Sequence, residues 1–150
     1  MSQTLKQRIL DDIKIAMKAG EKDRLMVLRM LSAAIKQREV DERIEMDDTQ
    51  TVAVIEKMIK QRRESIRQYE EGARPELAAK EQAEIGILEP YLPEQLSQLE
   101  LDKLIEDAIA ASGAVEMKDM GKVMGVLKPK IQGRADMAVV SAQIKAKLGA

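Results

Sequence analysis

Apolar residues recur every three or four positions along almost the whole chain. Leu25, Leu28, Leu31 and Ile35 show this spacing within the segment 21–43. Residues at such intervals lie on one face of an α-helix, whereas a half-buried strand requires strict alternation of apolar and polar residues. No segment of the sequence shows sustained alternation of that kind. The pattern therefore predicts an all-α fold.

Glycine, proline and capping residues divide this pattern into separate helices. Gly20 suits a helix end because glycine tolerates a left-handed backbone. Pro75 suits a first turn, where its missing N–H is not needed. Ser97 and Glu100 have the spacing of a capping box, and Pro129 is expected to limit the sixth helix. The sequence predicts seven helices, over residues 3–19, 21–43, 48–72, 75–91, 97–112, 117–130 and 136–148.

The segment between the fourth and fifth helices divides the chain into two parts. A chain of 150 residues can form one ordinary domain or two very small ones. Pro90 and Pro93 bracket the end of the fourth helix, and Glu94–Leu96 is expected to act as a hinge. We therefore expect an N-terminal bundle of about four longer helices over residues 1–93. A compact three-helix module should follow over residues 94–150.

The composition excludes several kinds of chemistry. The chain has no Cys and no His, which rules out thiol nucleophiles, Cys/His zinc sites, Ser-His-Asp triads and disulfides. No catalytic constellation is visible, so enzymatic activity stays an open question, and we expect no cofactor and no metal. Nothing resembles a signal peptide, and no apolar run approaches the roughly 18 residues of a membrane span. We expect a cytoplasmic location without a membrane partner.

Charge is distributed unevenly along the C-terminal module. The formal net charge of the chain is −1, which argues against a tight autonomous nucleic-acid binder. However, residues 94–117 carry −5 and residues 118–147 carry +5. Such a basic patch can hold a phosphate backbone, although an ordinary basic surface explains it as well. The candidate RNA-binding residues are Lys122, Lys128, Lys130 and Arg134.

A second set of cations lies on the second predicted helix. Its members are seven residues apart, so they line one side of the helix. They are Lys22, Arg29, Lys36 and Arg43. A stripe of this kind can follow phosphates, or it can be the solvated flank of an amphipathic helix.

Two further patterns predict contacts between helices. Arg62 falls in the apolar seam of the third helix, where a charge needs a partner. If the third and fourth helices form a hairpin, that partner is Glu84 or Glu81, and the pair sets the helix register rather than forming a site. Gly121 and Gly125 are four residues apart, and this spacing indicates close packing between helices.

Three stretches of the sequence are similar to a known family. They are Leu25–Val40 (LMVLRMLSAAIKQREV), Glu56–Ser97 (EKMIKQRRESIRQYEEGARPELAAKEQAEIGILEPYLPEQLS) and Asp119–Ser141 (DMGKVMGVLKPKIQGRADMAVVS). Together they resemble the YqeY-like family, which is related to the C-terminal tail domain of the tRNA-dependent amidotransferase B subunit. The resemblance implies the same two-part helical architecture. It also implies kinship with a module that touches the elbow of tRNA while the rest of the amidotransferase performs the chemistry.

The third stretch is the part most like that tail. The resemblance places the family's positions at Gly121, Lys122, Met124, Gly125, Gly133, Arg134, Ala135 and Asp136. It also links the chain to carbon–nitrogen ligases that use glutamine as amido donor. The amidase Ser-Ser-Lys site and the ATP- and metal-binding cradle of such enzymes are not visible in this sequence.

Three functions follow as hypotheses. The leading one is a non-catalytic accessory domain that binds tRNA or another structured RNA through phosphate contacts, weakly on its own. Because the only rings are those of Tyr69 and Tyr91, base stacking has little to contribute. The second is a protein-interaction adaptor that uses Met-rich faces or the cationic stripe of the second helix. The third is an amidotransferase-associated component with amidotransferase subunits as partners. The oligomeric state stays open.

Overall fold

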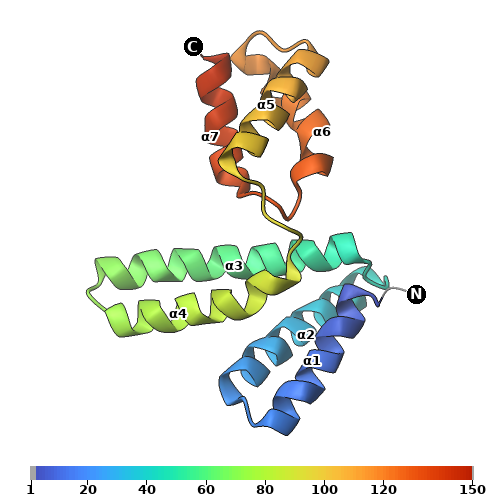
Figure 1. Ribbon diagram of the computed structural model, residues 1–150, viewed down its shortest axis with the longest axis vertical. Helices are drawn as coiled ribbons and strands as arrows, with labels where there is room; N and C mark the ends of the chain where they lie inside the picture. The colour runs from blue at the N-terminus through green and yellow to red at the C-terminus, as the bar shows by residue number, and fades with distance from the viewer. Residues whose placement is uncertain (1–2, 150) are drawn as a thin grey trace. The chain divides into compact units, whose positions relative to one another are not determined.

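The computed structural model describes residues 3–149, and every regular element within them is helical. The described part of the chain thus confirms the all-α prediction (Figure 1). The chain divides into two compact units, Met1–Leu92 and Pro93–Ala150. The outermost residues of the two expected domains, at positions 1, 2 and 150, lie outside the described range.

Four α-helices and a short 3-10 turn make up the N-terminal unit. They are α1 (Leu5–Ala19), α2 (Lys22–Glu42), α3 (Asp48–Glu71), α4 (Pro75–Leu88) and the 3-10 turn η1 (Glu89–Tyr91). Figure 1 shows α1 and α2 as one antiparallel pair and α3 and α4 as a second. Aliphatic side chains fill the core between the pairs, and the fully buried ones include Ile9, Leu28, Leu31, Ile55, Ile85 and Leu88.

Side-chain caps fix where α1 and α3 begin. The Thr4 hydroxyl accepts from the backbone N–H of Gln7 at 3.2 Å, and the Gln7 side chain accepts from the N–H of Thr4. Asp47 and Gln50 form the same reciprocal pair at the start of α3. Each pair satisfies two backbone donors that a helix leaves without partners. Gly20 ends α1 in the left-handed region at φ 70°, where glycine avoids the strain of a Cβ.

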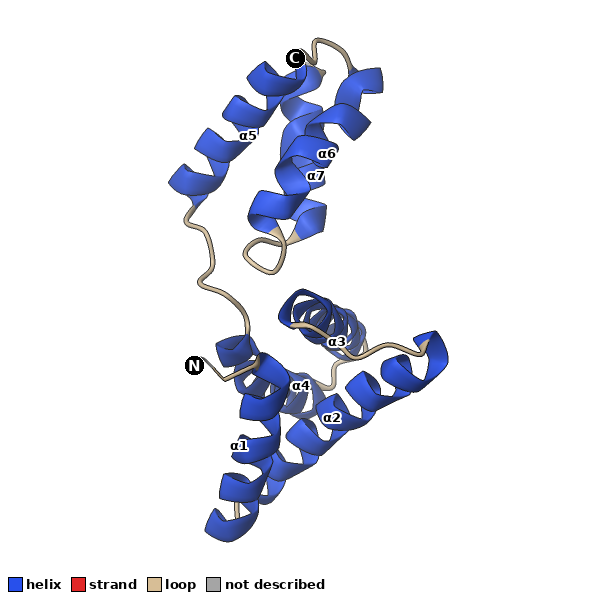
Figure 2. Cartoon of the chain, turned by 90° about the vertical axis from the view of Figure 1, so that its right-hand side faces the viewer, coloured by secondary structure: helices blue, strands red, loops and turns tan. Residues whose placement is uncertain are grey.

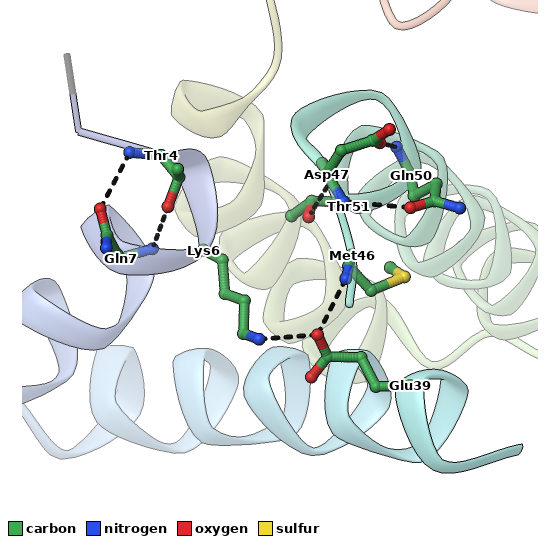
Figure 3. Close-up of polar contacts among 8 residues, drawn as sticks. All are labelled: Thr4, Lys6, Gln7, Glu39, Met46, Asp47, Gln50 and Thr51. Carbon is green, nitrogen blue, oxygen red and sulfur yellow. Dashed lines mark hydrogen bonds and ion pairs between the residues drawn. The ribbon is translucent and has the colours of Figure 1, made fainter. Parts of the chain in front are cut away.

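One carboxylate ties three segments of the N-terminal unit together (Figure 3). Glu39 of α2 accepts from Lys6 Nζ of α1 at 2.6 Å and from the backbone N–H of Met46, before α3, at 2.9 Å. These two hydrogen bonds, led by the one from Lys6, hold the pKa of Glu39 below its usual value. A single ionised side chain therefore fixes the connection between α2 and α3 against the first helix.

Arg62 lies in the buried seam of α3, as its position in the apolar pattern predicts. Its Nη2 is 3.7 Å from Oε1 of Glu84 on α4, which confirms the expected ion pair across the hairpin. Arg62 is only 7% exposed, and its Nη1 also donates to the carbonyl of Met58 at 3.2 Å. Nε of Arg62 and Oε2 of Glu84 are buried without a hydrogen-bond partner.

The C-terminal unit is a bundle of three helices around its own aliphatic core (Figure 2). Its elements are α5 (Gln98–Ser112), the 3-10 turn η2 (Met117–Asp119), α6 (Met120–Ile131) and α7 (Met137–Leu148). The predicted capping box at the start of α5 is confirmed, because Ser97 Oγ accepts from the N–H of Glu100 at 3.1 Å and Glu100 Oε1 accepts in return from the N–H of Ser97. The fully buried side chains of this core include Ile105, Val123, Leu127, Ile131, Val140 and Ile144.

Two predicted helix ends in the C-terminal half differ from the structure. The sixth helix ends at Ile131, one residue beyond the predicted end, and Pro129 lies in its last turn. The side chain of Ile131 is completely buried, so packing holds the last turn although Pro129 donates no hydrogen bond. The sixth helix also begins later than predicted, since Met117–Asp119 forms a 3-10 turn before α6.

Candidate nucleic-acid interface on α6

Core packing in the C-terminal unit decides which side of α6 meets solvent. Three buried aliphatic residues at intervals of four anchor the helix to the core. They are Val123, Leu127 and Ile131. The exposed surface carries glycine and lysine side by side, at Gly121, Lys122, Gly125 and Lys128. The helix thus presents a smooth backbone flanked by cations.

The two glycines of this surface pack against nothing in the described part of the chain. An added Cβ at Gly121 or at Gly125 would meet no atom within 4 Å beyond the helix itself. The prediction of close helix packing at this pair is therefore wrong. The reason is rotational: the core contacts of α6 come from its other side, and the glycine spacing does not reveal which side of a helix is buried. The backbone of α6 is open to close approach here.

A buried carboxylate shapes the turn that leads into α6. Asp119 is 8% exposed and accepts from the backbone N–H groups of Val115 at 3.1 Å and Glu116 at 3.2 Å. These backbone hydrogen bonds, with a smaller contribution from nearby lysines, hold the pKa of Asp119 below its usual value. Lys122 Nζ lies 3.6 Å from Oδ1 of the same carboxylate. An acidic residue just before a helix is the local signal that reveals this turn.

The three lysines predicted to bind RNA are exposed but do not share one face. Lys122 and Lys128 lie on the glycine-bearing surface, one on each side of Gly125 along the helix. Residues two positions apart in a helix lie about 200° apart around its axis. Lys130 therefore projects from a different side of α6 than Lys128 does.

Arg134 takes part in a set of hydrogen bonds between residues 94–96 and 133–134, which no local sequence pattern predicts. Its Nε donates to the carbonyl of Glu94 at 3.0 Å, and its own carbonyl accepts from the N–H of Leu96 at 2.9 Å. Gln95 Nε2 donates to the carbonyl of Gly133 at 2.6 Å. The segment predicted to be a hinge, Glu94–Leu96, is thus bound to the loop before α7 and belongs to the C-terminal unit. Arg134 holds this loop rather than projecting as a free cation.

The cationic stripe of the second predicted helix lies on the surface of the N-terminal unit. All four of its residues are exposed, with Lys22, Arg29 and Lys36 on α2 and Arg43 at its C-terminal cap.

Among residues 3–149, no helix is long and apolar enough to cross a membrane. The same residues bring no group of three or more carboxylates together in a way that could hold a metal ion.

Curated proteins from fungi are similar to this chain. A protein of Pyrenophora tritici-repentis named "Altered inheritance of mitochondria protein 41, mitochondrial" is 32% identical over 147 residues, which cover 95% of this chain and 80% of that protein. A protein of the same name from Vanderwaltozyma polyspora is 29% identical over 117 residues, which cover 73% of this chain and 63% of that protein.

These names contradict the expected cytoplasmic location, because both relatives are named as mitochondrial proteins. The expectation rested on the absence of a secretory signal peptide and of a membrane span, and neither absence separates the cytoplasm from the mitochondrion.

The match to a protein-family model covers nearly the whole sequence. The model is described as Yqey-like protein, and it matches residues 6–148. It includes all three stretches that carry the resemblance as well as both structural units. This chain therefore belongs to the YqeY-like protein family.

Proposed function

We propose that this protein is a non-catalytic accessory module that binds tRNA or another structured RNA through the phosphate backbone. The observation that carries the proposal is the exposed surface of α6, where Lys122 and Lys128 flank glycines that pack against no described atom. The lysines neutralise phosphates, and the missing side chains let a sugar–phosphate backbone come close to the helix.

The glycines support a binding role because they weaken the helix that carries them. A glycine in a helix interior is about 1 kcal/mol less favourable than alanine. Gly121 and Gly125 gain no packing in return within the described structure. Their benefit is then an accessible helix surface, which suits recognition by shape and backbone rather than by base.

The four candidate residues take different roles in this proposal. Lys122 and Lys128 are the main phosphate contacts. Lys130, on another side of α6, contacts RNA only if the RNA strand wraps around that helix. Arg134 is a positioning residue, because its guanidinium holds the backbone of Glu94. Since the whole chain carries −1, we expect weak binding, in the range of about 10⁻⁴–10⁻⁶ M typical of non-specific contacts. A partner such as an amidotransferase subunit would raise the affinity by binding the same RNA.

Charge reversal tests the two main contacts. We would measure the affinity for fluorescently labelled tRNA over a salt series, comparing the unmodified chain with the double variant Lys122→Glu and Lys128→Glu. The variant should bind far more weakly, with a salt slope reduced by roughly 1.4–1.8, because each of the two phosphate contacts contributes roughly 0.7–0.9 to that slope. The matched control is Lys22→Glu with Lys36→Glu. Unchanged binding in the α6 variant would refute the proposal, and loss in the control would move the interface to α2.

A neutral variant tests the open helix surface separately. Gly125→Gln adds bulk and helix propensity without charge, so it should weaken tRNA binding while stabilising the fold. Gly86→Gln is the control, because a Cβ at Gly86 on α4 also meets no described atom within 4 Å. It should stabilise the fold equally and leave binding unchanged. Equal tRNA affinity in both variants would show that close approach to α6 plays no part.

A further inference from the structure

Helix α2 carries two apolar stripes, although the fold of the N-terminal unit uses only one. The buried stripe consists of Val27, Leu28, Leu31 and Ile35. On another side of the helix, Met26 is 58% exposed and Met30 is 47% exposed. A surface helix of a globular protein ordinarily has a single apolar stripe that faces the core. The second stripe stays about half exposed in the described structure.

The second stripe borders an open, shallow hollow of about 510 Å³, and all the residues that line it belong to α2. Four apolar and two cationic residues line it, and none of these described lining residues is acidic. They are Lys22, Leu25, Met26, Arg29, Met30 and Ala33. We call this surface the α2 groove. Methionine is common at surfaces that bind partner helices, because its flexible side chain adapts to different shapes.

The two cations of the α2 groove are available for an external partner. Lys22 and Arg29 are exposed, and neither forms an ion pair with any described residue. Arg24, on the same helix, lies instead 3.8 Å from Asp12 and 3.7 Å from Glu21. Asp12 and Glu21 are therefore directed at Arg24, and Lys22 and Arg29 form no ion pair with Asp23, the acid in the first turn of α2.

The floor of the groove is partly fixed in place. Sδ of Met30 lies 4.0 Å from Nη2 of the buried Arg62, which is itself held by Glu84. A side chain that is already positioned loses less entropy when a partner binds. The side chain of Met30 is thus partly positioned before a partner binds, whereas no such contact positions the side chain of Met26.

A second groove in the same unit shows what sets the α2 groove apart. It runs between α2 and α3, and charges of both signs line it, including Arg38, Asp41, Glu42 and Lys57. Arg38 and Glu42 also form an ion pair with each other. That groove offers no net charge to select a partner, whereas the α2 groove offers only positive charge.

We propose that the α2 groove binds an amphipathic helix of a partner protein, with acidic residues beside its apolar anchors. From Lys22 to Ala33 the helix rises about 17 Å at about 1.5 Å per residue, enough for three turns of a partner helix. Apolar anchors at intervals of three, four and seven residues match the methionines, and acids two turns apart match Lys22 and Arg29. This proposal stands apart from RNA binding, which we place in the other unit.

Synthetic peptides test the proposal with the full chain. One labelled helical peptide of about four turns carries leucine anchors with glutamate on both flanks, and a second carries lysine in place of each glutamate. The acidic peptide should bind saturably and the basic peptide should not. Met26→Gln with Met30→Gln should weaken binding at least tenfold. Arg29→Glu should do the same and should reduce the salt dependence of binding, because Lys22 is then the only cation left in the groove. Both methionines are exposed, so these variants should keep the fold.

Matched controls change equivalent residues outside the groove. Met17→Gln removes another exposed methionine, 52% exposed on α1, and Lys60→Glu reverses an exposed charge on α3. Both should bind the acidic peptide like the unmodified chain. The proposal is overturned if the two peptides bind equally or if the acidic peptide does not bind. It is also overturned if the groove variants bind unchanged, or if light scattering shows that a second copy of the chain fills the groove. Loss of tRNA binding in Arg29→Glu with intact peptide binding would likewise overturn it.

Discussion

At the scale of single residues, the N-terminal unit depends on buried polar groups that are only partly satisfied. Arg62 meets Glu84 and one backbone carbonyl, yet one nitrogen of the guanidinium and one oxygen of the carboxylate lack partners. An ion pair of this kind contributes little net stability over an apolar pair, but removing one partner leaves an uncompensated charge. Its value lies in fixing the register of α3 against α4.

We therefore predict unequal effects of two neighbouring substitutions. Arg62→Ala should destabilise the fold by about 2–4 kcal/mol, because it strands Glu84. Arg63→Ala, at an exposed position, should cost far less. Urea unfolding followed by circular dichroism measures both. The double variant Arg62→Met with Glu84→Leu should recover most of the loss. Equal losses for Arg62→Ala and Arg63→Ala would contradict a buried ion pair in the seam.

Tyr91 predicts a loss of stability at alkaline pH. Burial, together with its 2.6 Å hydrogen bond to Asp12, raises the pKa of Tyr91 from 10.0 to about 12. Between these values the hydroxyl ionises in the unfolded chain before it ionises in the folded protein. Its stabilising contribution is therefore complete below pH 10 and is lost as the pH rises towards about 12.

Tyr91→Phe is the comparison that isolates this effect. The variant should be less stable by about 1 kcal/mol at neutral pH, because the hydrogen bond to Asp12 is gone. Its deficit should shrink between pH 10 and pH 12, because ionisation of Tyr91 removes a stabilising contribution that phenylalanine lacks at every pH. Urea midpoints at several alkaline pH values measure it. A constant deficit over that range would contradict the raised pKa.

At the scale of helices and turns, short-range chemistry fixes the ends and core packing fixes the rotation. Reciprocal caps begin α1, α3 and α5, and left-handed glycines end α1 and α5. The rotation of α6 about its axis is set by core packing instead of by local caps. Because its aliphatic residues are buried, two glycines face solvent. Glycine thus serves opposite purposes at helix ends and in the interior of α6.

Two alanine substitutions should separate these purposes. Gly125→Ala should raise stability by about 0.5–1 kcal/mol, because the added methyl group meets no described atom and alanine is the better helix former. Gly113→Ala should lower stability by about 1 kcal/mol, because φ is 69° at the end of α5. Thermal unfolding compares the two. Destabilisation by Gly125→Ala would mean that the surface of α6 is packed.

At the scale of the whole molecule, the chain forms two units with separate aliphatic cores. Leu92 packs against the first core and Leu96 against the second. Glu94–Leu96 also bonds to Gly133 and Arg134, so it is part of the C-terminal unit rather than a free linker. The C-terminal unit therefore begins several residues before its first helix.

Fragments of the chain should report this boundary. A fragment of residues 93–150 should fold and unfold cooperatively, because it retains both its core and the bonds to the loop before α7. A fragment of residues 97–150 should melt at a lower temperature, since it lacks those bonds and the Leu96 side chain. Circular dichroism melting compares the two. Equal melting temperatures would show that the segment adds nothing to the unit.

The sequence by itself determined what depends on neighbours within about four residues. It predicted the all-α class, most helix ends and the cap at Ser97 and Glu100. From the position of Arg62 in the apolar seam it also predicted a partner at Glu84 or Glu81, and the structure shows Glu84. Hydrogen bonds of caps and turns are local, so their pattern is visible in a short stretch of residues. The apolar spacing of α3 also predicted one contact with a neighbouring helix, α4.

Tertiary structure alone decided which helix surfaces were left open and which distant segments met. Three features belong to this class: the exposed glycines of α6, the exposed methionines of α2, and the bonds between Glu94–Leu96 and the loop before α7. A helix with apolar residues on two sides can bury either one, and packing against the other helices makes the choice. That choice depends on the free energy of the complete core, to which residues far apart in the chain contribute together.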